Sequence, residues 1–166
     1  MNNGLMRKFG DGQLHNGHYV NMCVEDSLKA ISFDDFNIIL TDDEDDNPYI
    51  WDTSHIFLKG SCDIFALALH KLFGYETYEI KNQSNGNLIH CYAQSTYNGK
   101  PVYIDVRGAS TDFNDFYKPW YLNTNYFITP QNLENKLDCA DYFDTGFKFA
   151  CAIIEKYLEY YDFQSH

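Results

Sequence analysis

Positive charge is scarce in this chain. Its 166 residues hold 12 Lys and Arg against 24 Asp and Glu, which gives a formal net charge of −12. Such a charge repels phosphate backbones, so the sequence argues against nucleic-acid binding through a basic patch. Acidity most often serves solubility, and it leaves open a basic partner protein.

Paired cysteines and long apolar runs are also missing. The five cysteines include no C-x-x-C pair, which argues against a disulfide framework or a zinc ribbon and indicates a reducing compartment. Residues 1–13 lack the apolar stretch of a signal peptide, and no run is long enough to span a membrane. We therefore expect a cytoplasmic protein without a membrane partner.

Common nucleotide and metal motifs are absent as well. The chain has no Walker A loop, no G-x-G-x-x-G and no H-E-x-x-H. His15 and His18 with Cys23 could bind a metal, but an arm rich in Asn and Gly is a poor cage. The acidic run Asp42–Asp46 lacks the ligand spacing of an EF-hand and is interpreted as a solvated loop. We expect no metal and no organic cofactor.

What the chain does have is enough apolar material for one core. Hydrophobic residues make up 45% of the chain and aromatic residues 17%, too much for a disordered protein. We expect residues 1–18 to form a loose N-terminal arm and residues 19–166 to form a single α+β domain. No internal repeat or linker divides it, and the sequence carries no signal for an oligomeric state.

One helix is well marked, over residues 62–73. Ser61 precedes it as an N-cap candidate, and Gly74 follows as a C-terminal stop. Apolar residues cover nearly its whole circumference, so the helix is expected in the centre of the protein. They are Ile64, Phe65, Leu67, Ala68, Leu69, Leu72 and Phe73. Cys62 occupies the first turn, where backbone N–H groups and the helix dipole lower the pKa of a thiol.

Three strands are predicted next, over residues 75–80, 88–97 and 101–107. Asn98-Gly99 is a strong hairpin signal. A two-residue turn there makes the numbers of paired residues sum to 197, which puts four side chains on one face of the sheet. They are His90, Tyr92, Asp105 and Arg107. His90 and Asp105 are then diagonal neighbours about 7 Å apart, while Cys91 faces the other way as a filler residue.

The C-terminal part is predicted to be helical. Thr129-Pro130 is a candidate start, because Pro is favoured in a first helical turn. A longer helix follows with one apolar face. That face comprises Phe143, Phe147, Cys151, Ile154, Leu158 and Tyr161.

Three segments together resemble the core of the transglutaminase-like superfamily. They are Gly60-Ser61-Cys62 with its apolar helix, His90-Cys91-Tyr92, and Tyr103-Ile104-Asp105-Val106. The resemblance covers 45–50 residues and implies a papain-like fold, with a central buried helix packed on an antiparallel sheet. It also implies that Cys62, His90 and Asp105 are nucleophile, base and orienting residue. In this chain Cys91-Tyr92 stands where the family has a small residue and Trp, and no oxyanion-hole side chain is matched upstream of Cys62.

The residues and the resemblance lead to one functional hypothesis and one rival. The first is a cysteine-dependent amide hydrolase or acyl transferase, such as a peptidase, glutamine deamidase or transglutaminase, acting on a protein or peptide. Its expected substrate-binding residues are Tyr92, Arg107, Ser61 and His55. The rival is a non-catalytic acidic binding or inhibitor protein, of the kind that a phage or mobile element encodes, on the same scaffold.

Overall fold

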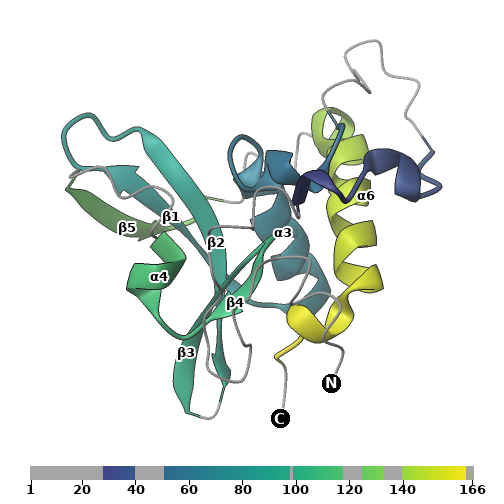
Figure 1. Cartoon of the computed structure of the whole chain (residues 1–166). Coiled ribbons are helices and arrows are strands. Elements are labelled where there is room, and N and C mark those ends of the chain that lie inside the picture. Colours follow the sequence, from purple (N-terminus) through teal and green to yellow (C-terminus); the bar gives the residue numbers. More distant parts are fainter. Residues whose placement is uncertain (1–27, 40–50, 98, 118–124, 133–139, 164–166) are drawn as a thin grey trace.

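The computed structural model describes residues 28–39, 51–97, 99–117, 125–132 and 140–163. Within these ranges a five-stranded antiparallel sheet packs against helix α3 (Cys62–Phe73), and α3 in turn packs against α6 (Ala140–Lys156) (Figure 1). The α+β class is therefore confirmed. None of the described helices is both long and apolar enough to cross a bilayer.

The sheet has the strand order β4-β3-β2-β1-β5. Its strands are β1 (Glu76–Asn82), β2 (Leu88–Tyr97), β3 (Lys100–Asp105), β4 (Gly108–Ser110) and β5 (Tyr126–Pro130). Short elements complete the fold: η2 (Phe33–Asp35), η4 (Ser54–Phe57), α4 (Phe113–Tyr117) and η6 (Leu158–Tyr160). Every neighbouring pair of strands is antiparallel.

Helix α3 lies in the core as its composition predicts. Residues 64–69 are all buried, and Gly74 ends the helix in the left-handed conformation, with φ 75° and a 2.7 Å hydrogen bond from its N–H to the His70 carbonyl. Two details differ from expectation. Ser61 occupies the N-cap position without a capping hydrogen bond from its side chain, and Leu72 is 40% exposed.

The predicted hairpin register between β2 and β3 is confirmed. Tyr97 pairs with Lys100 and Ala93 pairs with Ile104, so the paired numbers sum to 197. Asn98 itself lies outside the described residues. Because the two-residue turn fixes which side chains are opposed, it also fixes which ones share a face.

The predicted helix start at Thr129-Pro130 is wrong. These residues end β5, where Thr129 pairs with Glu79 and Pro130 with Tyr78. Aromatic and β-branched residues before them suit a strand, and an edge strand tolerates a proline because one side of it needs no ladder donor. The C-terminal helix is confirmed as α6, but Leu158 and Tyr161 fall beyond its end, in and after η6.

Several other expectations concern residues outside the described ranges. These are the arm over residues 1–18, the possible ligands His15, His18 and Cys23, and the run Asp42–Asp46.

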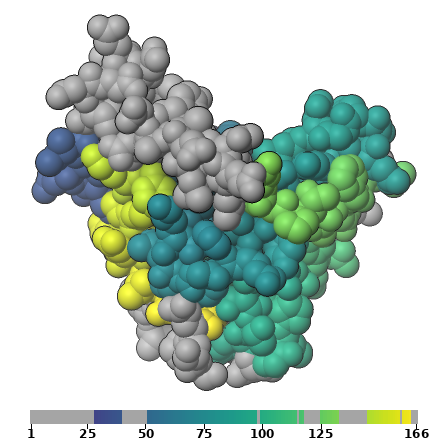
Figure 2. Space-filling view, turned by 180° about the vertical axis from the view of Figure 1, so that it is seen from behind, coloured from purple at the N-terminus to yellow at the C-terminus, as the bar shows by residue number. Residues whose placement is uncertain are grey.

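The two faces of the sheet have different coverings. On one side, here called the aromatic face, α4 closes over a cluster of rings in mutual contact (Figure 1). The cluster comprises Tyr78, Tyr92, Tyr103, Phe113, Phe116 and Tyr117. On the other side, the helix face, α3 packs against β2 through Cys62, Ala66 and Cys91. The reverse view shows the β1, β2 and β5 end of the sheet projecting from the body, with a hollow beside it (Figure 2).

Candidate active site

The start of α3 is set by a tight approach at Gly60. Its φ is 147°, and a Cβ atom there would lie 3.2 Å from the Ile56 carbonyl oxygen, so the position favours glycine. The next residue, Ser61, donates its N–H to the same carbonyl at 2.8 Å. This turn directs Cys62 into the first turn of α3 against β2, where the side chain keeps only 5% of its surface exposed.

Strand β2 extends beyond the end of its partner β3. Backbone groups in this part of β2 are therefore available to bond with Cys62. The β2–β3 pairing stops before Cys91, which the same register would put opposite Val106. The Val106 carbonyl instead accepts a 2.6 Å hydrogen bond from the Tyr161 hydroxyl. The backbone N–H of Cys91 donates to the Cys62 Sγ at 3.3 Å. A sulfur atom thus stands where a β-ladder carbonyl would otherwise accept.

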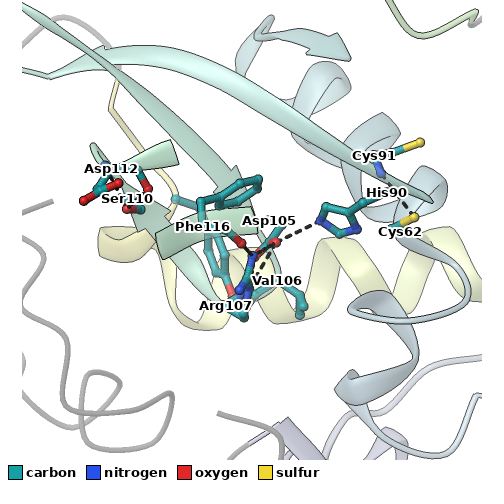
Figure 3. A network of polar contacts seen from close by, with 10 residues as sticks. Cys62, His90, Cys91, Asp105, Val106, Arg107, Ser110, Asp112 and Phe116 are labelled. Carbon is teal, nitrogen blue, oxygen red and sulfur yellow. Dashed lines mark hydrogen bonds and ion pairs between the residues drawn. The ribbon is translucent and has the colours of Figure 1, made fainter. Parts of the chain in front are cut away.

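On the aromatic face of the same strand, His90 is joined to Asp105. The His90 Nε2 and the Asp105 Oδ2 are 2.9 Å apart, as the predicted diagonal requires. His90 is fully buried and Asp105 is 3% exposed. Figure 3 shows the imidazole between Asp105 on one side and Cys62 on the other. Nε2 is thus the ring nitrogen that faces the carboxylate.

Arg107 holds the Asp105 carboxylate from behind. Its Nε lies 3.0 and 3.1 Å from the two carboxylate oxygens, its Nη2 lies 2.6 Å from Oδ2, and its backbone N–H donates to Oδ1 at 2.9 Å. The guanidinium also donates to the Phe116 carbonyl at 2.8 Å and lies over the Phe116 ring, 4.9 Å from its centroid. Asp105 is therefore fixed in both position and orientation.

These contacts decide the charge of the carboxylate. Burial raises the pKa of Asp105, but the charge of Arg107 and the hydrogen bonds from His90 and Arg107 outweigh it and lower the pKa to about 2. Asp105 is thus ionised at neutral pH, which keeps a proton on the His90 Nε2.

The Cys62 thiol and the His90 imidazole each shift the pKa of the other. A hydrogen bond with the Cys91 side chain is the largest cause of a lowered pKa for Cys62; burial opposes it, while His90 and the Cys91 N–H add to it. Burial is the largest influence on His90 and disfavours its charged form, but hydrogen bonds with Asp105 and Cys62 prevail and raise the pKa of the imidazole. The pair therefore favours thiolate and imidazolium.

Two predicted substrate-binding residues need correction. Tyr92 shares the face of His90 as expected, but the predicted strand over residues 101–107 ends at Asp105, so Arg107 lies in the turn before β4; each of the two residues is only 2% exposed. Tyr92 stacks on Tyr78 and contacts Phe116 by its edge, and Arg107 serves Asp105. Both side chains lie inside the protein because α4 covers the aromatic face, and neither offers a surface to a substrate.

The other two predicted substrate-binding residues lie near the start of α3. Ser61 directly precedes Cys62, and His55 belongs to η4, which packs against α3; both are partly buried. Their role in substrate binding stays a prediction. The neighbouring Ser54 is a structural residue, because its buried hydroxyl donates to the Leu28 carbonyl at 2.6 Å.

Two residues near Cys62 were not found from the sequence as part of the site. Cys91 was interpreted as a filler, yet its face is the one that α3 packs on, so its N–H and thiol both meet Cys62. Gln131 was placed in a predicted helix. Its side-chain Nε2 donates to the Asp63 carbonyl at 3.2 Å, beside the start of α3. The alternation of side chains along β2 could have placed Cys91 on the face that meets α3. No sequence feature near Gln131 indicated its contact with the start of α3.

Within the described ranges, no group of three or more His, Cys, Asp or Glu side chains is arranged to hold a metal ion.

No protein-family model, curated protein or solved structure matches this chain significantly. The likeness to the transglutaminase-like superfamily therefore rests on the order of the three motifs in the sequence and stays a prediction.

Proposed function

We propose that this protein is a cysteine-dependent amide hydrolase or acyl transferase with a papain-like arrangement, acting on a peptide bond or a glutamine-type carboxamide of a protein or peptide. The observation that supports it best is the position of His90, which lies between Cys62 and Asp105, is hydrogen-bonded to the ionised carboxylate and lowers the pKa of the thiol. A low-pKa thiol, a base and an orienting carboxylate are the parts that acyl transfer needs.

In the proposed reaction, the Cys62 thiolate attacks the substrate carbonyl carbon. The developing oxyanion lies at the first turn of α3, where backbone N–H groups, including that of Cys62, have no partners within the helix. Protonated His90 gives its Nδ1 proton to the leaving nitrogen as the C–N bond breaks and a thioester forms. Water or an amine then attacks the thioester, giving a proton back to His90 and restoring the thiol. Asp105 stabilises the imidazolium throughout.

The rival function, a non-catalytic binding protein, has one observation in its favour. Cys62 is 5% exposed and His90 is fully buried, so the described residues give a substrate little access to the sulfur. On this alternative, the net charge of −12 would attract a basic partner. Neutralising acidic surface would then weaken the partner complex most at low salt.

Replacement of the three residues separates these functions. The assay measures ammonia release and new amino termini from a mixture of glutamine-containing peptides. Cys62→Ala should abolish turnover and His90→Ala should be nearly as damaging. Asp105→Asn should lose about 10³–10⁴-fold, because the imidazole loses its tautomer preference and its charge partner. Each variant is checked by thermal melting.

Cys151 provides the matched control. It lies in α6, where burial raises the pKa of its thiol to about 12. Cys151→Ala should therefore leave turnover unchanged. Iodoacetamide at mildly acidic pH should label Cys62 before Cys151, since the thiolate is the reacting form. Full activity in Cys62→Ala would end the enzyme hypothesis.

A further inference from the structure

The helix face of the sheet continues past the start of α3, and two rows of opposed residues cross it there. Glu79 of β1 pairs with Cys91 of β2 and with Thr129 of β5. Lys81, two positions along β1, pairs with Phe127 of β5 and, after a register shift between Ile80 and Lys81, with Leu88 of β2. Because opposed residues share a face, both rows lie on the face that carries Cys91 and meets Cys62.

The outer row is exposed and apolar at both ends. Leu88 is 46% exposed and Phe127 is 39% exposed. Lys81 between them forms a 3.3 Å ion pair with Glu79 of the inner row. The two charges compensate each other, so this part of a strongly acidic protein presents no net charge to a ligand.

The inner part of the same surface contains polar atoms that need a partner. Thr129 Oγ1 and Gln131 Oε1 are both buried, and neither has a hydrogen-bond partner among the residues that the structure describes. Gln131 is 7% exposed, and its Nε2 bond to the Asp63 carbonyl ties it to the first turn of α3. Buried polar groups are nearly always bonded, so two adjacent exceptions beside a nucleophile indicate a site that a ligand completes.

Resting on the proposed function, we propose that this surface binds the substrate as an extended peptide segment. It comprises Glu79, Lys81, Leu88, Phe127, Thr129 and Gln131, and is here called the strand platform. The segment carries a large apolar side chain that packs on Leu88 and Phe127, and its backbone N–H groups donate to Thr129 and Gln131.

The spacing of the two rows gives the position of that side chain. Two residues of a strand span about 7 Å, so the outer row lies about 7 Å beyond the row that ends at Cys91. An extended peptide covers the same span with two residues. The apolar side chain therefore belongs two residues from the carbonyl that Cys62 attacks.

The test uses acetylated pentapeptides with glutamine at the centre and either Phe or Ser two residues away. Wild-type protein should turn over the Phe peptide with about tenfold or higher kcat/KM than the Ser peptide. Phe127→Ser and Leu88→Ser should remove most of that preference. The rate of Cys62 alkylation by iodoacetamide should stay unchanged, because neither residue perturbs the thiol.

Ile128→Ser is the matched control. Ile128 adjoins Phe127 and is 41% exposed, but it pairs with Ile80 and faces the other way. It should keep the peptide preference within about twofold, and all three variants should melt like the wild type. The proposal would be overturned if Ile128→Ser and Phe127→Ser lost the preference for the Phe peptide equally. It would also be overturned if the wild type turned over the Phe and Ser peptides equally.

A binding measurement separates failure of the platform from failure of the enzyme hypothesis. The same peptides are titrated into Cys62→Ala by calorimetry, which needs no turnover. If wild type turns over neither peptide but the Phe peptide binds and Phe127→Ser weakens it, the proposed function fails and the platform stands. If turnover is real but binding does not distinguish Phe127→Ser from Ile128→Ser, the platform fails alone.

Discussion

On the aromatic face of β2, every charged group of the candidate site is buried and hydrogen-bonded. On the helix face, the part of the sheet beyond the start of α3 is exposed. His90, Asp105 and Arg107 lie at 3% exposure or less and are linked by hydrogen bonds of 2.6–3.1 Å. On the other face, Leu88 and Phe127 are at least 39% exposed. Cys62 lies where these two regions meet.

The two faces of the sheet therefore have different physical properties. Buried charges interact strongly because water does not screen them, so the sealed face can hold a fixed proton arrangement. The open face is free to change its contacts when a ligand arrives. Four experiments test this contrast, starting with the largest expected effect.

Arg107→Met should destabilise the protein by about 3–5 kcal/mol, because it leaves the Asp105 charge buried without compensation. Urea unfolding measures the loss. Asp105→Asn with Arg107→Met should recover part of it. As a comparison on the open face, Lys81→Met breaks a partly exposed pair with Glu79 and should cost at most about 1 kcal/mol. Similar costs for Arg107→Met and Lys81→Met would contradict the contrast.

Acid should weaken the sealed face selectively. The pKa of Asp105 is about 2 in the folded protein against an ordinary value of 3.8. A carboxyl with a lowered pKa stabilises the fold above its unfolded pKa, and that contribution disappears as the pH falls through the folded one. Stability should therefore drop by about 2 kcal/mol between about pH 4 and pH 2. In Asp105→Asn the free energy of unfolding, measured by urea denaturation, should fall less steeply between these pH values. The same pH dependence in Asp105→Asn and wild type would contradict a stabilising role of the ionised Asp105.

The boundary between the two regions depends on Tyr161. Its hydroxyl donates to the Val106 carbonyl at 2.6 Å where β3 ends. Tyr161→Phe leaves that buried carbonyl without its donor and should cost about 1.5 kcal/mol in urea unfolding. Tyr126→Phe, at a residue that is 36% exposed, should be close to neutral. A neutral Tyr161→Phe would mean that this bond does not hold the end of β3 away from Cys91.

The smallest effect is expected on the open face itself. Leu88→Ser should change the free energy of unfolding by no more than about 0.5 kcal/mol, as exposed positions usually do. Leu69→Ala in the fully buried part of α3 should cost about 2–5 kcal/mol. A large cost at Leu88 would show that the strand platform contributes to the core of the protein.

Local signals were sufficient to predict the hairpin and the main helix. The Asn98-Gly99 turn fixes the parity of both strands, so the His90–Asp105 contact follows from counting. Helix α3 follows from an apolar run between Gly60 and Gly74. These elements depend on residues close together in the sequence.

What could not be predicted depends on contacts between distant parts of the chain. Thr129 and Pro130 form an edge strand because β1 is available to pair with them, a partner some 50 residues away. The alternation of strand residues could not place Arg107, because β3 ends at Asp105 and the guanidinium folds back from the following turn onto that carboxylate. Burial of that face follows from α4, whose packing leaves no local pattern.

The N–H of Cys91 gives the site a built-in spectroscopic reporter. Its hydrogen bond ends on the Cys62 sulfur rather than on a carbonyl, so the charge of that sulfur acts directly on the amide proton. The Cys91 amide resonance should therefore move as the Cys62 thiol titrates, while interior amides of the β2–β3 ladder, such as that of Ser95, stay in place. The ionisation of the Cys62 thiol can then be followed in the intact protein without a ligand.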